Sequence, residues 1–400
     1  MRVKTLLLAA AALSLAVPAA LAPPARAQNK PPIKVGAILP MSGFTATYGA
    51  LFWTGMKMAL DDINAKGGVN GSQIEIQRED DQLAATQSVL LFRKLVESKA
   101  VVSLGPVSGT AWENIGPLSA QLKMPAINFT ALKPGISAKP WALRIHPPDD
   151  TMIPEGVAEF VKKFPNAKKI VIAGDAKEAS GLAGIEEFQK AAKANGLQVL
   201  ELVEYQTRTT DFSPIVIKIR GLNPDAIFIA SLAPTSLPFV KELETQGVKS
   251  PLLISALAWS GPFVNVIGSA GANLYTMGYA TNASSPTFPA YVDYAKRFLD
   301  ITKDIPSIPK PANVANTVMA YEALAFVADI MKRKGVDGRT DPVKARELIK
   351  DGMAEAKEFK DIITFTIRGS YDGHIKSHLL KADIANKVWV FGLEEKDRIK

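Results

Sequence analysis

Short apolar segments typical of buried β-strands alternate with helical patterns along most of this chain. Three of these segments, at residues 33–39, 100–104 and 226–230, are nearly continuous runs of apolar side chains. A strand with apolar residues at successive positions is buried on both faces, as happens when helices cover both sides of a parallel sheet. The alternation therefore predicts an α/β fold built from βαβ units.

The alternation falls into two series of similar size, which predicts two lobes. The first series occupies residues 28–146, and the second begins at Pro147-Pro148 and runs to residue 274. No long stretch rich in Gly, Ser or Pro separates them, so we expect tight crossovers rather than a flexible linker. Three further helices are expected with little strand between them, and we assign them to the first lobe; they lie at residues 289–303, 314–334 and 341–356.

The first residues predict an export signal. Arg2 and Lys4 precede an apolar run over residues 6–22, and Ala25-Arg26-Ala27 fits a small-x-small cleavage site. The run is about as long as the shortest membrane-spanning helices, but its prolines and the cleavage site favour removal over anchoring. Residues 1–27 are therefore predicted to be a cleaved signal peptide, which leaves a soluble exported chain.

Composition excludes several kinds of site. The chain has no cysteine, so it has no disulfide, thiolate metal site or cysteine nucleophile. The formal net charge falls by three, from +8 to +5, when Arg2, Lys4 and Arg26 leave with the signal. The remaining cations are interspersed with acids, which is too diffuse for a nucleic-acid interface but suits weak attraction of anionic solutes.

Motifs for catalysis or cofactor binding are absent. The sequence has no Gly-x-Gly-x-x-Gly after a strand, no phosphate-binding loop with Gly-Lys-Ser/Thr and no Gly-x-Ser-x-Gly. His374 and His378 have the spacing of two metal ligands on a helix, but Asp372-Gly373 predicts a turn there. We therefore expect no metal, no cofactor and no enzyme activity.

The segment Val107-Ser108-Gly109-Thr110 has the character of a ligand cradle. It lies where a buried strand should end and a helix begin, and ligands of open α/β sheets bind at the carboxyl ends of strands. A helix N-terminus offers free amide hydrogens to a carboxylate, and Ser108 and Thr110 add hydroxyl donors. The alternative is that these two side chains only cap the helix.

Two other segments resemble parts of a binding site. The strand end at Thr130-Ala131 has the same character as the cradle. Tyr48 is expected in a loop after the first strand, where its ring could cover a ligand or take part in ordinary packing.

Several motifs together resemble the leucine/isoleucine/valine-type periplasmic binding proteins. Each motif is short, but their order and spacing extend over nearly all of the chain after the signal. The matching segments are Ile33-Lys34-Val35-Gly36, Met41-Ser42-Gly43, Tyr48-Gly49, Asp62-Ile63-Asn64-Ala65-Lys66-Gly67-Gly68-Val69-Asn70-Gly71, Gly105-Pro106, Asp211-Phe212-Ser213, Pro224-Asp225 and Tyr321-Glu322-Ala323-Leu324.

The resemblance implies a type I periplasmic-binding fold, in which two lobes joined by three crossovers close around a solute in the periplasm. It implies that the chain returns to the first lobe over residues 275–366 and completes the second lobe over residues 367–400. Such a protein is the solute-capturing component of an ABC importer. The expected partners are a small organic acid or amino acid and the ABC permease complex in the inner membrane, and we expect a monomer.

The resemblance also assigns residues of the first lobe to the ligand. In the family, the ligand carboxylate is held by segments that match Val107 to Thr110 and Thr130-Ala131-Leu132 here. Tyr48 matches an aromatic residue that contacts the ligand. This assignment agrees with the cradle expected from the position of the strand ends.

The second lobe departs from the amino-acid-binding members of the family. Those members use an acid on the loop that here holds Leu257 and Trp259, and tyrosines near the positions of Ala179 and Leu232. Burying an ammonium group without a counter-charge costs several kcal/mol. An α-amino acid would therefore be poorly held unless another acid such as Glu178 reaches the ligand, and the apolar wall favours an aromatic or other hydrophobic organic acid.

Alternatives remain at two points. A branched-chain or related amino acid is the alternative ligand, and ligand sensing through a membrane receptor is the alternative function, because a fold does not fix a function. Arg144 ends the strand at the expected first crossover, where it either reaches the cleft or pins the hinge through a salt bridge. We favour the role in the hinge.

Overall fold

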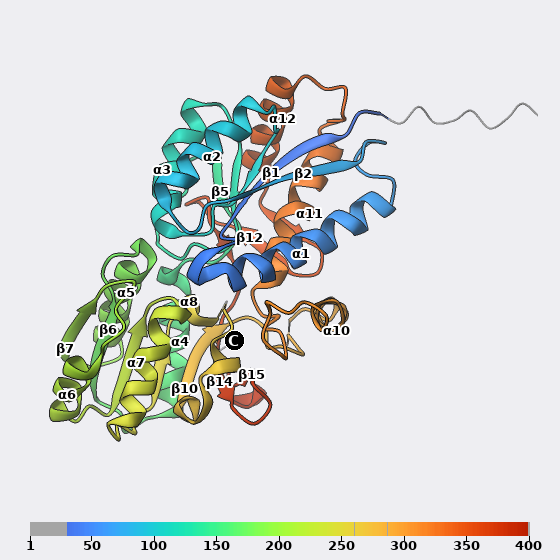
Figure 1. The fold of residues 1–400 in the computed structure, drawn as a ribbon. Coiled ribbons are helices and arrows are strands. Elements are labelled where there is room, and N and C mark those ends of the chain that lie inside the picture. Colours follow the sequence, from blue (N-terminus) through green and yellow to red (C-terminus); the bar gives the residue numbers. More distant parts are fainter. Residues whose placement is uncertain (1–29, 260, 286, 399–400) are drawn as a thin grey trace, which may run out of the picture.

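Two α/β lobes stacked on one another make up the computed structural model, which describes residues 30–259, 261–285 and 287–398 (Figure 1). The predicted signal peptide, residues 1–27, lies outside these residues. No helix in the described part of the chain is long and apolar enough to cross a membrane.

The first lobe is built on a parallel sheet with the strand order β2-β1-β3-β4-β5. Its elements are β1 (Ile33–Leu39), α1 (Ala46–Ala65), β2 (Ile74–Asp80), α2 (Ala85–Glu97), β3 (Ser103–Leu104), α3 (Gly109–Gln121), β4 (Ala126–Asn128) and β5 (Ala142–Arg144). Side chains of β1 alternate between two cores: Ile38 joins the core formed with α2 and α3, whereas Val35 and Leu39 join the core that contains α1. Both faces of β1 are covered, which explains its continuous apolar sequence.

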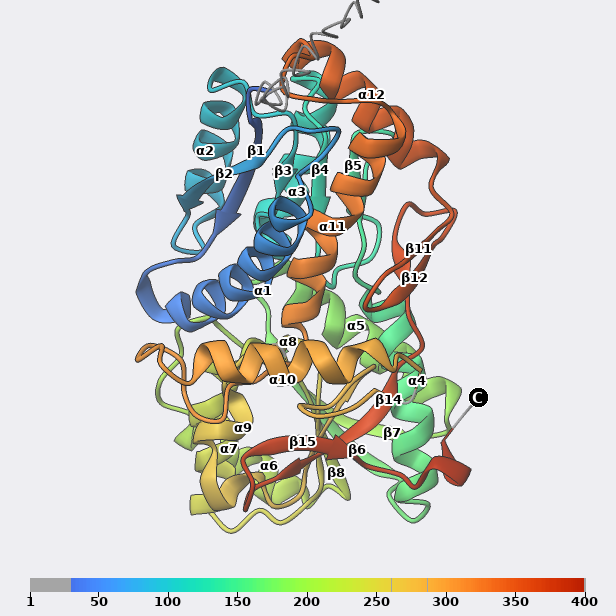
Figure 2. The same ribbon diagram turned by 90° about the vertical axis from the view of Figure 1, so that its right-hand side faces the viewer.

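The second lobe is built on a mixed sheet with the strand order β15-β14-β10-β9-β8-β6-β7. Strands β6 to β10 are parallel, and β14 and β15 are added antiparallel at one edge (Figure 2). The elements are α4 (Asp149–Lys163), β6 (Lys169–Asp175), α5 (Ala179–Ala194), β7 (Gln198–Tyr205), α6 (Ser213–Leu222), β8 (Ala226–Ala230), α7 (Ala233–Thr245), β9 (Leu252–Ile254), α8 (Ala256–Trp259), α9 (Phe263–Val266), β10 (Leu274–Gly278), β14 (His378–Asp383) and β15 (Val388–Phe391).

The chain returns to the first lobe between β10 and β14. This part contains α10 (Ala290–Thr302), α11 (Thr317–Arg333), α12 (Pro342–Glu355) and an antiparallel sheet of β11 (Glu358–Lys360), β12 (Thr364–Ile367) and β13 (Gly373–His374). Asp62 of α1 accepts hydrogen bonds from Arg297 of α10 (2.8 Å) and Tyr321 of α11 (3.0 Å), which attaches both helices to the first lobe. Since β10 belongs to the sheet of the second lobe, the return follows Gly278, a few residues after the boundary predicted at residue 274.

A buried ion pair joins two of the three connections that the described chain makes between the lobes. These connections lie between β5 and α4, between β10 and α10, and between β13 and β14. Arg144 at the end of β5 donates through Nη2 and Nε to Asp372 Oδ1 (2.7 and 3.0 Å), which lies just before β13. Its Nη1 donates to the carbonyl of Ala131 (3.0 Å), and the side chain is fully buried. Arg144 therefore pins the hinge and does not line the cavity described below.

Replacing Asp372 with Asn should lower the free energy of unfolding by about 3–5 kcal/mol, because Arg144 would stay buried without its counter-charge. The exposed pair of Asp329 and Arg333 provides a control, and Asp329→Asn should cost no more than about 0.5 kcal/mol. Urea unfolding followed by circular dichroism measures both losses. Small and equal losses would contradict the hinge role of Arg144.

Asp149, in the first turn of α4, is a buried carboxyl group close to the same hinge. Neither of its oxygens accepts a hydrogen bond within the described residues. Burial raises the pKa of this carboxyl group well above its ordinary value, and the nearby charge of Arg144 opposes the rise only in part. Over a range of pH the group is therefore protonated in the folded protein but ionised in the unfolded chain.

Asp149→Asn should gain stability relative to the wild type as the pH rises. Wild-type stability is lost as the pH rises from about 4 through the raised pKa of Asp149, because ionisation there favours the unfolded chain. Thermal unfolding between about pH 5 and about pH 8 should show a Tm difference that grows with pH. A constant difference for Asp149→Asn would rule out this raised pKa.

Candidate functional site

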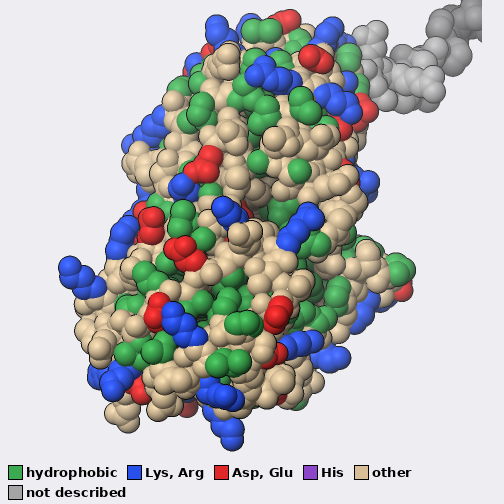
Figure 3. All heavy atoms as spheres, turned by 60° about the vertical axis from the view of Figure 1, so that its left-hand side comes forward, with side chains coloured by type: hydrophobic (Ala, Val, Ile, Leu, Met, Phe, Trp, Pro, Cys, Tyr) green, Lys and Arg blue, Asp and Glu red, His purple; other side chains and the backbone are tan. Residues whose placement is uncertain are grey.

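A cavity lies between the two lobes, at the carboxyl ends of strands from both sheets. It holds about 480 Å³ of space free of protein atoms, part of it open to solvent. The surface is hollowed between the lobes, with hydrophobic side chains in the hollow (Figure 3). The lining residues are Pro40, Thr45, Tyr48, Phe52, Leu83, Val107, Ser108, Gly109, Thr130, Ala131, Glu178, Ser180, Leu232 and Leu257.

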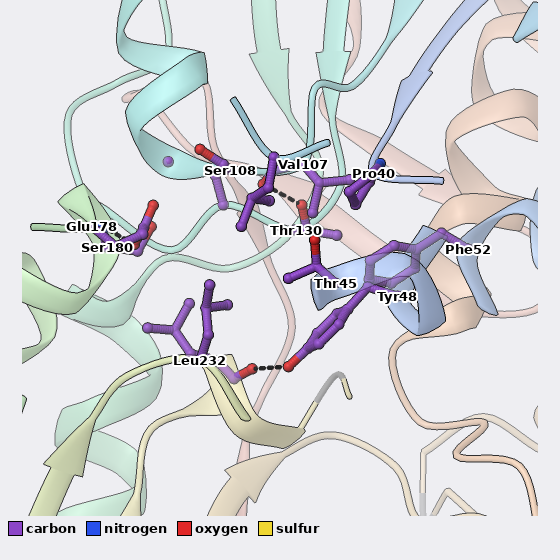
Figure 4. Close-up of a pocket in the computed structure, with 14 residues that line it drawn as sticks. Pro40, Thr45, Tyr48, Phe52, Val107, Ser108, Thr130, Glu178, Ser180 and Leu232 are labelled. Carbon is purple, nitrogen blue, oxygen red and sulfur yellow. Dashed lines mark hydrogen bonds between the residues drawn. The ribbon is translucent and has the colours of Figure 1, made fainter. Parts of the chain in front are cut away.

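Aromatic and aliphatic side chains form one wall of this cavity. Tyr48 and Phe52 project from α1 of the first lobe, and Leu232 faces them from the second lobe (Figure 4). The Tyr48 hydroxyl donates to the carbonyl of Leu257 and accepts from the amide of Ala233, both at 3.2 Å. Burial raises the pKa of Tyr48, so its hydroxyl stays neutral. Tyr48 therefore bridges the two lobes.

The helix α1 begins earlier than the sequence pattern indicated. Tyr48 was expected in a loop, but it lies in the first turn of α1. Gly49 and Gly55 weaken the helical pattern, because glycine is a poor helix former. Both glycines serve packing: a Cβ would lie 2.3 Å from the carbonyl oxygen of Pro40 at Gly49, and 2.4 Å from that of Thr317 at Gly55. Close backbone contacts thus outweigh local propensity here.

The predicted cradle lies at the N-terminus of α3. Ser108 caps this helix, since its Oγ accepts from the amide of Ala111 (3.1 Å), and it also lines the cavity. The Ser108 hydroxyl hydrogen and the Gly109 amide have no acceptor among the described residues. The Thr110 amide donates to Glu178 Oε1 (3.2 Å) of the second lobe. Two donors of the cradle are therefore available to a solute.

The second predicted segment, at the end of β4, lines the cavity with two of its three residues. Thr130 and Ala131 border the cavity, and their amides donate to Asn128 Oδ1 (2.9 and 2.7 Å). Leu132 lies outside the lining, and its amide donates to Ser180 Oγ (3.3 Å). Ser180 thus joins α5 to this loop, a contact that no sequence pattern indicated.

Glu178 is a buried acid in the wall of the cavity. It caps α5, because its Oε2 accepts from the amides of Ser180 (2.6 Å) and Gly181 (3.0 Å). Burial raises the pKa of its carboxyl group, and these amides, with that of Thr110, oppose the rise. The acid that the sequence analysis named as a substitute partner for an ammonium group is therefore next to the cavity.

Only two of the other four residues predicted for the second lobe line the cavity. Leu232 and Leu257 line the cavity, whereas Ala179 and Trp259 do not. The indole of Trp259 is fully buried against Tyr279 (ring centroids 4.8 Å apart) and against Gly278, where a Cβ would lie 2.6 Å from the ring. Because Gly278 has no side chain, the ring of Trp259 packs against it in the core and does not reach the cavity.

Some residues that line the cavity were not predicted from the sequence. Phe52 lies four residues after Tyr48 on the same helix face, so the earlier start of α1 would have revealed it. Leu83 has a positive φ of 61° in the turn after β2, a conformation that its residue type does not suggest. Pro40 and Thr45 were not named either.

The histidines weighed as metal ligands lie on separate strands. His374 is on β13 and His378 on β14, where its Nδ1 lies 3.0 Å from Glu159 Oε1. Within the described ranges, no group of three or more His, Asp and Glu side chains could hold a metal ion.

Comparison with known proteins identifies the family. The sequence profile of the periplasmic binding protein family matches residues 32–385. An amino acid binding protein from Pseudomonas aeruginosa is 28% identical over 223 residues, which are 54% of this chain and only 58% of that protein. The chain thus spans less than two thirds of the length of this relative.

Two solved structures have the same fold. A leucine-binding protein from Thermotoga maritima aligns with a TM-score of 0.76 and 21% identity, over 90% of this chain and 98% of that one. A solute-binding protein of an ABC transporter from Rhodopseudomonas palustris HaA2, in complex with p-hydroxybenzoic acid, aligns with a TM-score of 0.76 and 24% identity, over 90% and 96%. The predicted two-lobed type I fold is confirmed, and the chain belongs to the periplasmic binding protein family.

Proposed function

We propose that this protein captures a small hydrophobic carboxylate, preferably an aromatic acid, in the periplasm and delivers it to an ABC importer. The observation that carries the proposal is the cavity itself, which both lobes enclose and which combines an aromatic wall with the N-terminus of α3. An apolar cavity with a few convergent polar groups is typical of a small-molecule site.

The two ends of the cavity suit the two parts of such a solute. The Ser108 hydroxyl and the Gly109 amide would donate to the carboxylate, and the partial positive charge at the N-terminus of α3 favours an anion there. Tyr48, Phe52 and Leu232 would contact the apolar body. The p-hydroxybenzoic acid bound by the R. palustris protein is a solute of this class.

A branched-chain or related amino acid is a second candidate, and the position of Glu178 favours it. This carboxylate lines the cavity and could neutralise an ammonium group. The similar fold of the leucine-binding protein from T. maritima agrees with this candidate. Ligand sensing through a membrane receptor would use the same site.

The family and the predicted signal support export to the periplasm and partnership with a permease. Residues 1–27 would direct the chain to the periplasm, where a monomer would present the captured solute to the permease complex. The role is binding and not catalysis, which agrees with the absence from the sequence of the motifs sought for nucleophiles and cofactors.

Thermal unfolding with a panel of solutes tests the proposal. Benzoate and 4-hydroxybenzoate should raise the Tm, because a solute at 100 times its Kd stabilises the folded state by about 2.7 kcal/mol. Leucine and valine represent the second candidate. Stabilisation by leucine or valine without any by the aromatic acids would contradict the preferred solute class.

Gly109→Ala should weaken solute binding at least about tenfold, because a Cβ at Gly109 would lie 2.3 Å from Ser180 Oγ and keep the lobes apart. The variant can avoid this strain by opening the lobes, so it should still fold, and its circular dichroism spectrum would show this. Gly221→Ala is the matched control, because no atom lies within 4 Å of a Cβ there. Isothermal titration with benzoate measures the affinity of both variants. Unchanged affinity in Gly109→Ala would show that solute binding does not need the close approach of Gly109 to Ser180.

A further inference from the structure

The carboxylate of Glu178 lies where the N-termini of two helices from different lobes meet. Its Oε2 accepts from the amides of Ser180 and Gly181 in α5, and its Oε1 accepts from the Thr110 amide of α3 (3.2 Å). The side chain is 7% exposed and stands beside Ser180, on the side of the cavity away from Phe52 (Figure 4). Glu178 therefore occupies part of the helix terminus at which we place the solute carboxylate.

The side chains packed around Glu178 are acids, so any of them that ionises adds negative charge. Asp175 at the end of β6 accepts the Glu178 amide through Oδ1 (3.2 Å), and its buried Oδ2 has no hydrogen-bond partner among the described residues. Asp149 of α4 interacts electrostatically with Glu178 and with Glu187 of α5. Glu187 is already paired with Lys190 (2.6 Å). The surroundings therefore disfavour a second anion next to Glu178.

The cations nearest to this region do not compensate for that charge. Lys177 and Arg208 line a hollow next to the cavity together with Glu178, but both side chains are exposed. Lys133, in the loop after β4, is paired with Glu113. Arg144 is held by Asp372 in the hinge. Solvent screens the exposed cations, so their effect on a buried carboxylate is weak.

A solute carboxylate bound by Ser108 and Gly109 would lie beside Glu178. A Cβ placed on Gly109 would lie 3.1 Å from Glu178 Oε1, so the Glu178 carboxylate is next to this residue of the cradle. Two carboxylates that share a site do not both ionise, and one proton is held between them. We propose that Glu178 couples the capture of a carboxylate solute to the uptake of one proton, which the solute carboxylate and the Glu178 carboxylate share.

This inference rests on the proposed function and makes Glu178 a specificity-determining residue. A solute with an ammonium group next to Glu178 would bind the ionised side chain and would need no added proton. Acidic surroundings therefore favour capture of carboxylates, and alkaline surroundings favour solutes with an ammonium group. The two candidate solute classes differ in the proton count of binding.

Isothermal titration of the wild-type protein with benzoate and with leucine tests the proposal. Titration in buffers of different ionisation enthalpy, at several values from about pH 5 to about pH 9, counts the protons bound with the solute. Benzoate should bind with close to one proton at the pH of maximal uptake, and around that pH its affinity should fall about tenfold for each pH unit. Leucine should bind without proton uptake.

Two variants separate Glu178 from other acids. Glu178→Gln should abolish both the proton uptake and the pH dependence of benzoate affinity, because an amide does not titrate. Glu186→Gln, an exposed acid on the same helix, should leave both unchanged. If Glu178→Gln does not fold, the absence of proton uptake in the wild type would still overturn the coupling.

The failures can be told apart. Benzoate binding without proton uptake at any pH, or with the same uptake in Glu178→Gln, would overturn the coupling alone. No benzoate binding at any pH would overturn the preferred solute class and the coupling together.

Discussion

The hinge depends on one buried guanidinium. Arg144 carries five N–H donors into the interior, where each donor left without an acceptor would cost free energy. Asp372 supplies the charge, and the carbonyls of Ala131 and Lys133 supply further acceptors. The same side chain thus joins two lobe connections and fixes the loop after β4, which borders the cavity. The Arg144 side chain therefore holds both the hinge and one border of the binding site in place.

The arrangement of strands and helices could be predicted from the sequence because its signals are local. The strand predicted at residues 33–39 is β1 with the same bounds, since burial on both faces requires apolar residues at successive positions. The placement of Tyr48 in a loop was wrong because glycines at 49 and 55 weaken the helical pattern of α1. Glycine is required at these positions because the backbone contacts Pro40 and Thr317, and Thr317 is far along the chain. Local propensity carries no information about such contacts.

The site was predictable where it depends on strand ends and unpredictable where it depends on side-chain direction. Ser108 and Thr130 follow strands of one parallel sheet, so topology alone brings them to the same edge. Trp259 also follows a strand, but the space beside Gly278 directs its ring into the core. Ser180 borders the cavity because α5 begins beside α3, a juxtaposition of two lobes that no local pattern encodes.

Closure of the lobes pairs hydrogen-bond donors and acceptors of the first lobe with those of the second. The amides of Thr110 and Leu132 meet Glu178 and Ser180, while Tyr48 links α1 to Leu257 and Ala233. These bonds form only when the lobes approach, so they favour the closed form without a solute. A solute must therefore contribute apolar burial in addition to polar contacts, because part of the polar stabilisation is already made by the protein itself. The apolar wall opposite the polar cradle supplies this apolar burial.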